Sequence, residues 1–426
     1  MVWIMSRWSK SFMLVKSRLK STNGKILFGN FSYLLLLQIA SYIFPLITLP
    51  YLAKTIGAAG FGKIAFAAAI VSWAQTVCDW GFSFTATRDV AKDKNNKELV
   101  SHIISNVTWA RILLTIVCAV ILILLMLFIP LFRDNSLVIS LTFLMVPGHI
   151  LFPDWFFQAI EKMQYITILS VLSKLGCLLA IFAFVKGPAD YYMQPLFISL
   201  GYVFSGGLAI YYILFKWKYK LYKPNCRQVK KVLSESADVF INNLAPNFYN
   251  SFSTMLLGGM CGNVATGKLD AGSKFAGALQ QFMQVIFKTF FPFLSRRIDK
   301  HGFFAKMSMM ITIVLCVVLY ILSPAIINVF FTDEFVDSVA ILRIYTVSVI
   351  FLSMSIVYGT NYLIIIHKER DLRNITMLSS LIGFVVAYPL IHFYGASGAA
   401  LTVCISRGLM GVLSFLKAKK YERQFI

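Results

Sequence analysis

Long apolar runs separated by short polar connections form the dominant pattern of the chain. Two examples, residues 112–130 and 375–393, are continuous and lack the two-residue alternation that is typical of barrel strands. In lipid, every backbone polar group must be bonded within its own helix or within a closed barrel. The pattern therefore predicts an all-α integral membrane protein.

Twelve spans of roughly 20 residues, the length that a bilayer requires, can be placed along the sequence. They lie near 31–53, 62–82, 103–130, 137–157, 166–186, 194–216, 239–259, 265–294, 307–330, 340–364, 375–393 and 396–416. The basic stretch 217–238 divides them six and six, which suggests a duplicated transporter. We expect an N-terminal half at 1–216, a cytoplasmic linker at 217–238 and a C-terminal half at 239–426.

Composition agrees with a membrane location and excludes several classes of partner. The chain is 58% hydrophobic and 14% charged, whereas about a quarter of a soluble domain is charged. Its net charge of +22 lies mostly in the connections, and not on a solvated face with interleaved aromatics, so we expect no nucleic-acid partner. The seven cysteines show no metal or redox spacing, and we expect no metal site and no cofactor.

Lys and Arg are divided unequally between alternate connections. Most of them lie in the basic tail at 1–27, in the C-terminal tail and in the connections on the same side. The opposite side holds only Lys54, Lys63, Arg133, Lys186, Lys268 and Lys274. Because cytoplasmic loops are enriched in Lys and Arg, we expect both termini in the cytoplasm.

Polar side chains form a stripe along the eighth span. Its members are Asp270, Lys274, Gly277, Gln281, Gln284 and Lys288. At helical spacing they fall within an arc of about 80° and extend over roughly 27 Å of the helix axis. One reading is a polar seam packed against another helix, with Asp270 and Lys274 paired. That pair leaves Lys288 without an obvious partner, so we favour a face that lines a water-filled cavity.

Related stripes mark the first, second and seventh spans. They consist of Gln38, Ser41 and Thr48; of Ser72, Gln75, Thr76, Asp79 and Ser83; and of Asn243, Asn247, Asn250 and Thr254. Pro45 and Pro50 are expected to break the outer half of the first span and to act as hinges. We therefore expect the first two spans of each half to share one polar lumen.

Three further cations lie inside predicted spans. Arg111 is close enough to the cytoplasmic end of its span to extend its head group to the surface. Lys174 and Arg407 lie deeper, and both a cavity role and a structural hydrogen bond remain open for them. The balance of charge in the lumen is cationic, which favours an anionic substrate such as a phosphate or pyrophosphate.

Several motifs resemble those of one family, the Wzx-type O-antigen flippases of the polysaccharide transporter family in the MOP (MATE-like) superfamily. The resemblance lies in Pro50-Tyr51-Leu52-Ala53-Lys54, in 57–67, in Asp79-Trp80-Gly81-Phe82 with 85–91, and in the specific stretch 155–166. Weaker matches occur at 256–258, 291–296 and 341–344.

The resemblance implies a non-enzymatic flippase in the bacterial inner membrane, with two six-helix bundles around a central cavity. Its substrate would be an undecaprenyl-pyrophosphate-linked oligosaccharide, the O-antigen repeat unit. Its partners would be membrane lipid, a polysaccharide polymerase and a chain-length regulator. Lys274, Lys288 and Arg407 would hold the pyrophosphate, and Asp79 with Arg88 would belong to a gate.

Coupling to H⁺ or Na⁺ would use Asp270. A MATE-like multidrug antiporter is the alternative within transport, although the cationic stripe argues against it. A membrane glycosyltransferase or polymerase needs large loops or catalytic carboxylates, which the pattern does not provide.

Overall fold

The computed structural model describes residues 22–424, and this part of the chain is almost entirely helical and contains no strand. Its α-helices are α2 (Thr22–Asp79), α3 (Phe82–Lys92), α4 (Lys97–Phe128), α5 (Pro130–Asp134), α6 (Ser136–Phe143), α7 (Met145–Leu151), α8 (Asp154–Ala159), α9 (Met163–Phe184), α10 (Met193–Tyr211), α11 (Cys226–Leu244), α12 (Ser251–Arg296), α13 (His301–Phe330), α14 (Ser338–Ser355) and α15 (Glu369–Gln424). Short 3-10 or π segments are η1 (Pro188–Tyr192), η2 (Tyr212–Lys216), η3 (Ala245–Phe248), η4 (Ile298–Lys300), η5 (Asp333–Phe335) and η6 (Ile356–Leu363). Most of the predicted basic tail, residues 1–21, lies outside the described residues.

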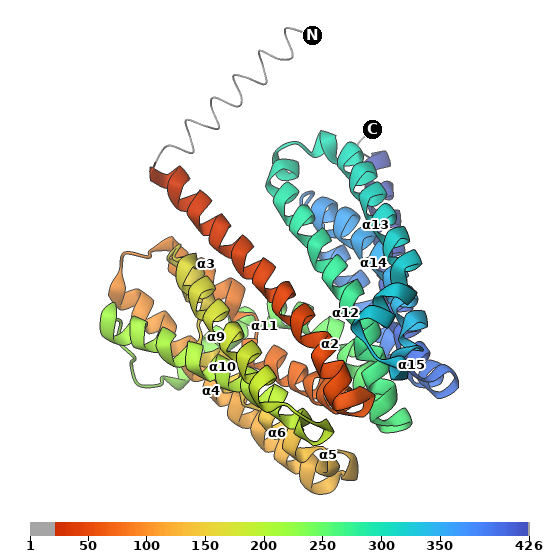
Figure 1. Ribbon diagram of the computed structural model, residues 1–426. Helices are drawn as coiled ribbons and strands as arrows, with labels where there is room; N and C mark the ends of the chain where they lie inside the picture. Colours follow the sequence, from red (N-terminus) through yellow and green to blue (C-terminus); the bar gives the residue numbers. More distant parts are fainter. Residues whose placement is uncertain (1–21, 425–426) are drawn as a thin grey trace.

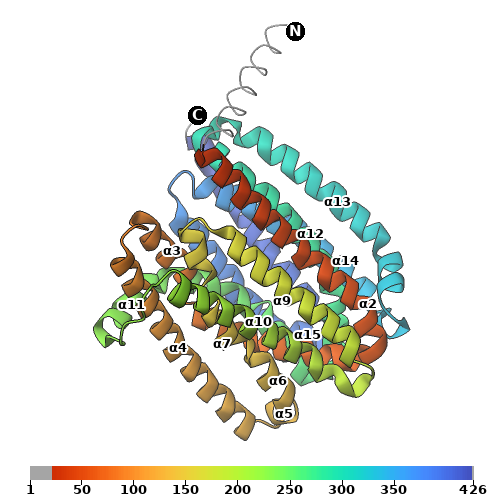
Figure 2. The same ribbon diagram turned by 60° about the vertical axis from the view of Figure 1, so that its left-hand side comes forward.

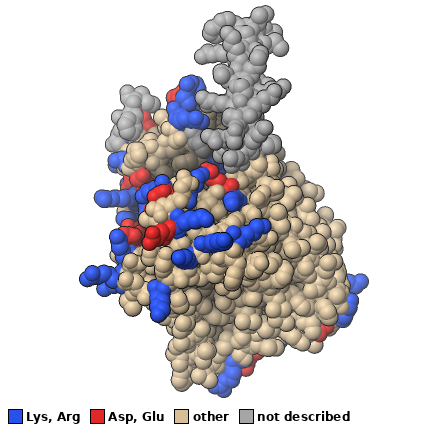
Figure 3. Space-filling view, turned by 90° about the vertical axis from the view of Figure 1, so that its left-hand side faces the viewer, with Lys and Arg blue, Asp and Glu red and all other residues tan. Residues whose placement is uncertain are grey.

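The described helices have the length and surface of membrane spans. Eight helical segments are long and apolar enough to cross a bilayer. On the face shown in Figure 3, charged residues gather at the end where the chain termini lie, above a broad uncharged surface, with a few more at the opposite end. Many large hydrophobic side chains are exposed, among them Phe128, Phe303 and Phe393, and a soluble protein rarely exposes so large an apolar area. The chain is therefore a multi-pass membrane protein, and the predicted number of twelve spans stays a prediction.

Three of the long helices bend sharply at a glycine. Gly57 in α2 has φ 64° and ψ −178°, Gly262 in α12 has φ 81° and ψ −178°, and Gly395 in α15 has φ 54° and ψ −129°. These angles favour glycine because it has no Cβ to clash with the backbone. Each of the three helices therefore consists of two arms.

Two predicted spans are interrupted. The fourth, at 137–157, is divided into α6, α7 and α8. Pro147 has no N–H to donate to the Phe143 carbonyl at the first break, and Pro153 directly precedes α8 at the second. The seventh, at 239–259, is interrupted by η3, which contains Pro246. Asn243 therefore lies in α11 before this break, and the predicted continuous stripe from Asn243 to Thr254 is wrong.

Helices from the two ends of the chain form separate groups, with α2 and α12 between them (Figure 1). One group includes α4, α6, α9 and α10, and the other includes α13, α14 and α15. In Figure 2, α9 runs alongside the first arm of α2, with which it packs. The first arm of α2 and the second arm of α12 diverge toward the end where both termini lie (Figure 1).

At the opposite end, α2 and α12 meet backbone to backbone. A Cβ added at Gly62 would lie 1.6 Å from the Asn263 carbonyl oxygen, and one added at Gly267 would lie 2.1 Å from the Ala58 carbonyl oxygen. Only glycine permits so close an approach. Gly62 and Gly267 therefore allow close packing, a role different from that of the bends at Gly57 and Gly262. We call this contact the glycine seam.

Side chains reinforce the glycine seam. The Ala58 N–H, at the start of the second arm of α2, donates to the Glu334 carboxylate in η5 at 2.9 Å. The Ser338 hydroxyl donates to the Lys268 carbonyl at 2.9 Å, and Lys268 Nζ lies 2.5 Å from an Asp337 oxygen. The first of these contacts joins residues of the two halves, so this end of the molecule is closed.

Candidate substrate cavity

A cavity of about 330 Å³ lies between the two halves, and we call it the central cavity. The second arm of α2 contributes small side chains, and α12 contributes most of the polar groups, with one residue each from α14 and α15. Its lining consists of Ala65, Ala68, Ala69, Ser72, Asn250, Ser251, Thr254, Leu269, Asp270, Ser273, Gly277, Gln280, Tyr345 and Arg407. Three of the four helical arms that were expected to form a lumen therefore line one cavity.

Asp270 and Arg407 are the charged groups in this lining. Asp270 sits on the second arm of α12 and forms an ion pair with Lys274 one turn later, with 2.9 Å between the carboxylate oxygen and Nζ. Arg407 on α15 is only 7% exposed, and its guanidinium donates to the Ser348 hydroxyl at 3.0 Å. Its Nε has no partner among the described residues. Arg407 therefore has both a cavity position and a structural hydrogen bond.

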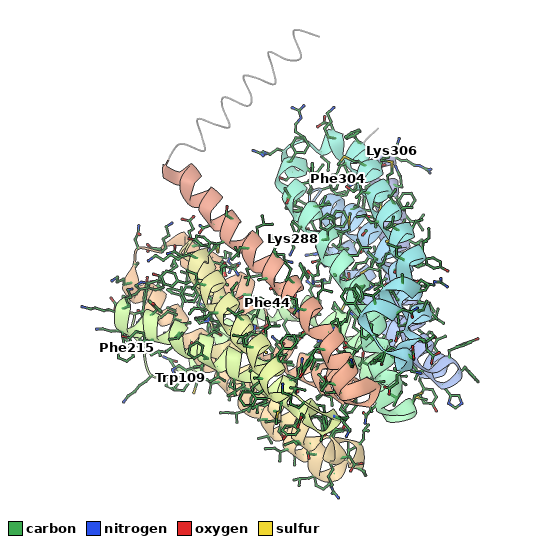
Figure 4. All side chains as sticks on the ribbon, in the orientation of Figure 1. Phe44, Trp109, Phe215, Lys288, Phe304 and Lys306 are labelled. Atoms are coloured by element: carbon green, nitrogen blue, oxygen red, sulfur yellow. The ribbon has the colours of Figure 1, made fainter. Side chains whose placement is uncertain are left out.

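The predicted stripe on α12 extends beyond the central cavity. Lys274 is partly exposed and Lys288 is exposed. In Figure 4 Lys288 lies in the space between α12 and the first arm of α2, toward the end where these helices diverge. Gln281 is exposed and Gln284 is half-buried on the same helix face. None of these four residues lines the central cavity, which includes only Asp270 and Gly277 of the stripe.

A hydrogen-bond chain joins the polar stripe on the second arm of α2 to η3 and the start of α12 near the central cavity. The Asn247 amide of η3 donates to the Thr76 hydroxyl at 2.8 Å, and the Ser72 and Ser251 hydroxyls are 2.6 Å apart. The Ser251 hydroxyl also donates to the side-chain amide oxygen Oδ1 of Asn247 at 3.4 Å. Ser72, Thr76 and Asn247 belong to two of the predicted stripes, so the sequence correctly indicated that these stripes share one region. Ser251 was not in a predicted stripe.

Asp79 occupies a different environment from the one predicted. Its carboxylate lies 3.0 Å from the Arg111 guanidinium and 3.8 Å from His149 Nε2. Arg111 is only 1% exposed, so the interpretation that it extends to the membrane surface is wrong. Arg88 is paired with its neighbour Asp89 at 2.9 Å and not with Asp79. A buried cation needs an anionic partner, and the half-buried carboxylate of Asp79 supplies it.

Pro45 and Pro50 do not break α2. The only non-helical backbone inside this helix is at Gly57, twelve and seven residues further on. The Thr48 hydroxyl donates to the carbonyls of Phe44 at 3.3 Å and Pro45 at 3.1 Å within this helical stretch. The expected break in the outer half of the first span is therefore wrong, and the hinge role of the two prolines stays a prediction.

Lys174 was grouped with the lumen residues, yet it lines another cavity, of about 300 Å³, among α2, α9 and α10. The sequence also missed residues that do line the central cavity, namely Ser273, Gln280 and Tyr345. Gln280 stands beside Gln281, and two adjacent glutamines in a span are a usable signal. Tyr345 gave no such signal, because an aromatic residue in a membrane span most often packs against neighbouring helices.

The fold and cavity define the class of protein, a helical membrane transporter. Among solved structures, the chain is similar to the lipid II flippase MurJ in an inward closed conformation, with a TM-score of 0.69 and 16% identity over 90% of this chain and 87% of that one. It is also similar to the eukaryotic MATE transporter AtDTX14, with a TM-score of 0.52 and 15% identity over 97% of this chain and 100% of that one. At these identities the likeness establishes the fold alone.

Sequence comparison then gives the family. The profile of the family described as "Polysaccharide biosynthesis protein" matches residues 27–298, more than half of the chain. The chain belongs to this family. It is 25% identical over 412 residues to the "Putative O-antigen transporter" of Escherichia coli (strain K12), covering 94% of this chain and 99% of the relative. A relative of the same name from Shigella dysenteriae is 25% identical over 402 residues, covering 92% and 99%. These relatives are transporters and not enzymes.

Proposed function

We propose that the protein is a flippase that moves an undecaprenyl-pyrophosphate-linked oligosaccharide, the O-antigen repeat unit, across the bacterial inner membrane. The observation that carries the proposal is the central cavity, in which a buried arginine meets a polar helix face. The names of the two O-antigen transporter relatives and the likeness to a lipid II flippase favour a lipid-linked glycan over a small solute.

The proposed architecture has twelve spans in two six-helix bundles, at 1–216 and 239–426, joined by the cytoplasmic linker 217–238. The bends at Gly57, Gly262 and Gly395 support it, because each divides one long helix into two arms. We place both termini in the cytoplasm, where the positive charges gather. In that orientation the conformation described is closed on the periplasmic side.

In the proposed mechanism, Lys288 attracts the pyrophosphate where α2 and α12 diverge, and Arg407 binds it in the central cavity. Lys274 starts paired with Asp270, so an arriving phosphate competes with the carboxylate for the same ammonium group. Arg suits the final site since its planar guanidinium forms two parallel hydrogen bonds to phosphate oxygens. The polar groups Asn250, Gln280 and Thr254 offer donors and acceptors to sugar hydroxyls.

Sugars outside this cavity would form hydrogen bonds with the exposed and half-buried stripe residues Gln281, Gln284, Asn243 and Asn247. Release of Lys274 leaves Asp270 free to take up H⁺ or Na⁺, which makes Asp270 the proposed coupling group. Alternating access would then close the diverging end and open the glycine seam. A polysaccharide polymerase and a chain-length regulator are the proposed partners on the receiving side.

The test is translocation of a fluorescent pyrophosphate-linked oligosaccharide in proteoliposomes. One charge-assisted hydrogen bond is worth about 1.5–3 kcal/mol, so R407Q and K288E should each lower the initial rate by about tenfold or more. The matched control is K306E, which reverses an exposed lysine on α13 outside the cavity (Figure 4). Full activity of R407Q and K288E at normal protein levels would contradict the pyrophosphate role. Transport of a cationic drug but not of the glycan would favour the MATE-like alternative.

A further inference from the structure

A second cavity, of about 300 Å³, lies within the N-terminal half, and we call it the side cavity. The first arm of α2, the helix α9 and the helix α10 form most of it. Its lining consists of Phe44, Pro45, Thr48, Phe152, Ser170, Ser173, Lys174, Cys177, Leu178, Ile181, Gln194, Ile198, Tyr202 and Ser205. None of these residues lines the central cavity, so the two cavities have separate linings.

Lys174 brings an uncompensated charge into the side cavity. It lies near the middle of α9, ten residues before the helix ends at Phe184, which places it roughly 15 Å from that end. No carboxylate lines the side cavity, and Lys174 forms no ion pair within residues 22–424. A charge at such depth costs several kcal/mol unless it has a partner.

Three polar side chains in the same lining also have hydrogen-bonding atoms without partners among the described residues. Ser170 and Ser173 form no hydrogen bond to other described residues, and both hydroxyls line the side cavity with Lys174. The side-chain oxygen of Gln194 is buried without a hydrogen-bond partner, although its amide remains available as a donor. An ammonium group, hydroxyls and an amide form a donor set suited to an anion.

The rest of the lining is apolar. Phe44, Phe152, Leu178, Ile181 and Ile198 supply a surface suited to a hydrocarbon chain. In Figure 4 Phe44 lies midway along the first arm of α2. The side cavity therefore combines a cationic polar end with an apolar wall inside a membrane protein. Its volume suits one phosphate group with a short length of chain.

From these observations we infer that the side cavity binds an amphiphile with one phosphate group, held by Lys174 and the neighbouring hydroxyls, with its hydrocarbon chain against Phe44 and Phe152. A single ammonium group balances a single phosphate charge, whereas the central cavity is proposed to take a pyrophosphate. The ligand comes from the membrane, as a prenyl phosphate or as an anionic phospholipid. Because Pro45 and Thr48 also line the cavity, a bound ligand holds the first arm of α2 against α9.

The experiment measures binding to the purified full-length protein in detergent by native mass spectrometry. The probes are farnesyl phosphate, a short-chain phosphatidylglycerol, and farnesol as the uncharged counterpart. All measurements are made in an R407Q background so that the central cavity contributes little. We expect K174Q to weaken binding of at least one phosphate probe by about tenfold or more and to leave farnesol unchanged. The matched control K306Q, on the exposed face of α13, should bind all probes as the parent does.

Each outcome decides the proposal. Loss of farnesyl phosphate binding alone identifies the prenyl phosphate as the source, and loss of phosphatidylglycerol binding alone identifies the phospholipid. If K174Q does not fold, K174M replaces it, because removal of an unpaired buried charge should not lower the stability of the free protein. Equal binding of the phosphate probes by the parent and the Lys174 variant, or no binding by either, overturns the inference. The result is independent of the flippase assay, so either proposal can fail alone.

Discussion

Alanine at Gly62 or Gly267 should prevent the glycine seam from forming. The added Cβ would lie 1.6 Å from the Asn263 oxygen in the first case and 2.1 Å from the Ala58 oxygen in the second, whereas real Cβ contacts are essentially never shorter than 3.0 Å. Both oxygens belong to the backbone and cannot rotate away. The two helices must therefore separate by about 1 Å or more, since packed interiors leave no slack.

The size of the effect follows from the cost of overpacking. Inserting one extra methyl group into a packed contact costs about 1–3 kcal/mol. Because this cost applies only to the conformation in which the seam is closed, it shifts the equilibrium between the closed and open conformations about 5- to 150-fold toward the open one. A variant with an alanine in the seam should therefore populate the form that is open at this end, and its flipping rate should fall because the cycle cannot return to the closed form.

Spin labels on Lys54→Cys and Val264→Cys can measure the separation across the seam in a cysteine-free background. Both positions are exposed, one on each helix. G62A and G267A should move the distance distribution to longer values. The control is G207A on α10, where an added Cβ meets nothing within 4 Å. If the seam variants give the same distances as G207A, the close backbone contact does not set the conformation and the reasoning is refuted.

Three further predictions concern contacts across the molecule. E334Q should weaken the cap on the second arm of α2 by about 0.3–1 kcal/mol and lengthen the same label distance slightly, because a carboxylate interacts favourably with a helix N-terminus. D79N should lower the thermal stability in detergent by about 1–3 kcal/mol, because it leaves Arg111 buried without its ion pair. An impermeant maleimide should label Cys261 in intact cells, and Cys226 only after permeabilisation, since both thiols are exposed and the proposed orientation puts the glycine seam beside Cys261 in the periplasm and the linker with Cys226 in the cytoplasm.

The controls for these variants come from exposed acids and from the double variant. E369Q, at an exposed carboxylate, should leave the label distance unchanged. D79N combined with R111Q should recover part of the lost stability, because no unpaired charge then remains. Equal stability of D79N and the parent would show that the Asp79–Arg111 pair contributes nothing. Labelling of Cys226 before permeabilisation would contradict the proposed orientation.

The helical membrane character could be predicted because backbone polar groups in lipid must be hydrogen-bonded within a helix or a closed barrel, and the long apolar runs of the sequence fit helices. The bend at Gly57 was also predictable, since Gly is the residue that adopts a positive φ most readily. The interruptions at Pro147 and Pro246 were missed. An apolar run with a proline in it can be a kinked span or several short helices, and tertiary packing decides between these outcomes.

Only part of the candidate site could be predicted, because spacing in the sequence relates residues of one helix and not residues of different helices. The stripe on α12 follows from the sequence alone, because its residues share one helix. The Asp79–Arg111 pair joins two different helices, and no spacing rule connects them. The same holds for Lys174, whose cavity exists only because α2, α9 and α10 pack together around it. Pairings between helices depend on rotation about each axis, which periodicity does not specify.

The two halves contain the same backbone turn but differ in the side chains around it and in the charges they bring to the central cavity. Gly57 and Gly262 have similar backbone angles. A Cβ added at Gly57 would lie 3.2 Å from the Glu334 carboxylate, whereas a Cβ added at Gly262 would meet nothing within 4 Å. In the central cavity the N-terminal half supplies alanines and one serine, whereas both charged groups, Asp270 and Arg407, come from the C-terminal half. A bound anion would therefore stay with the C-terminal half while the uncharged face of α2 moves relative to it. On this reasoning the substrate contacts persist through the cycle, and the contacts of the glycine seam are those that must break.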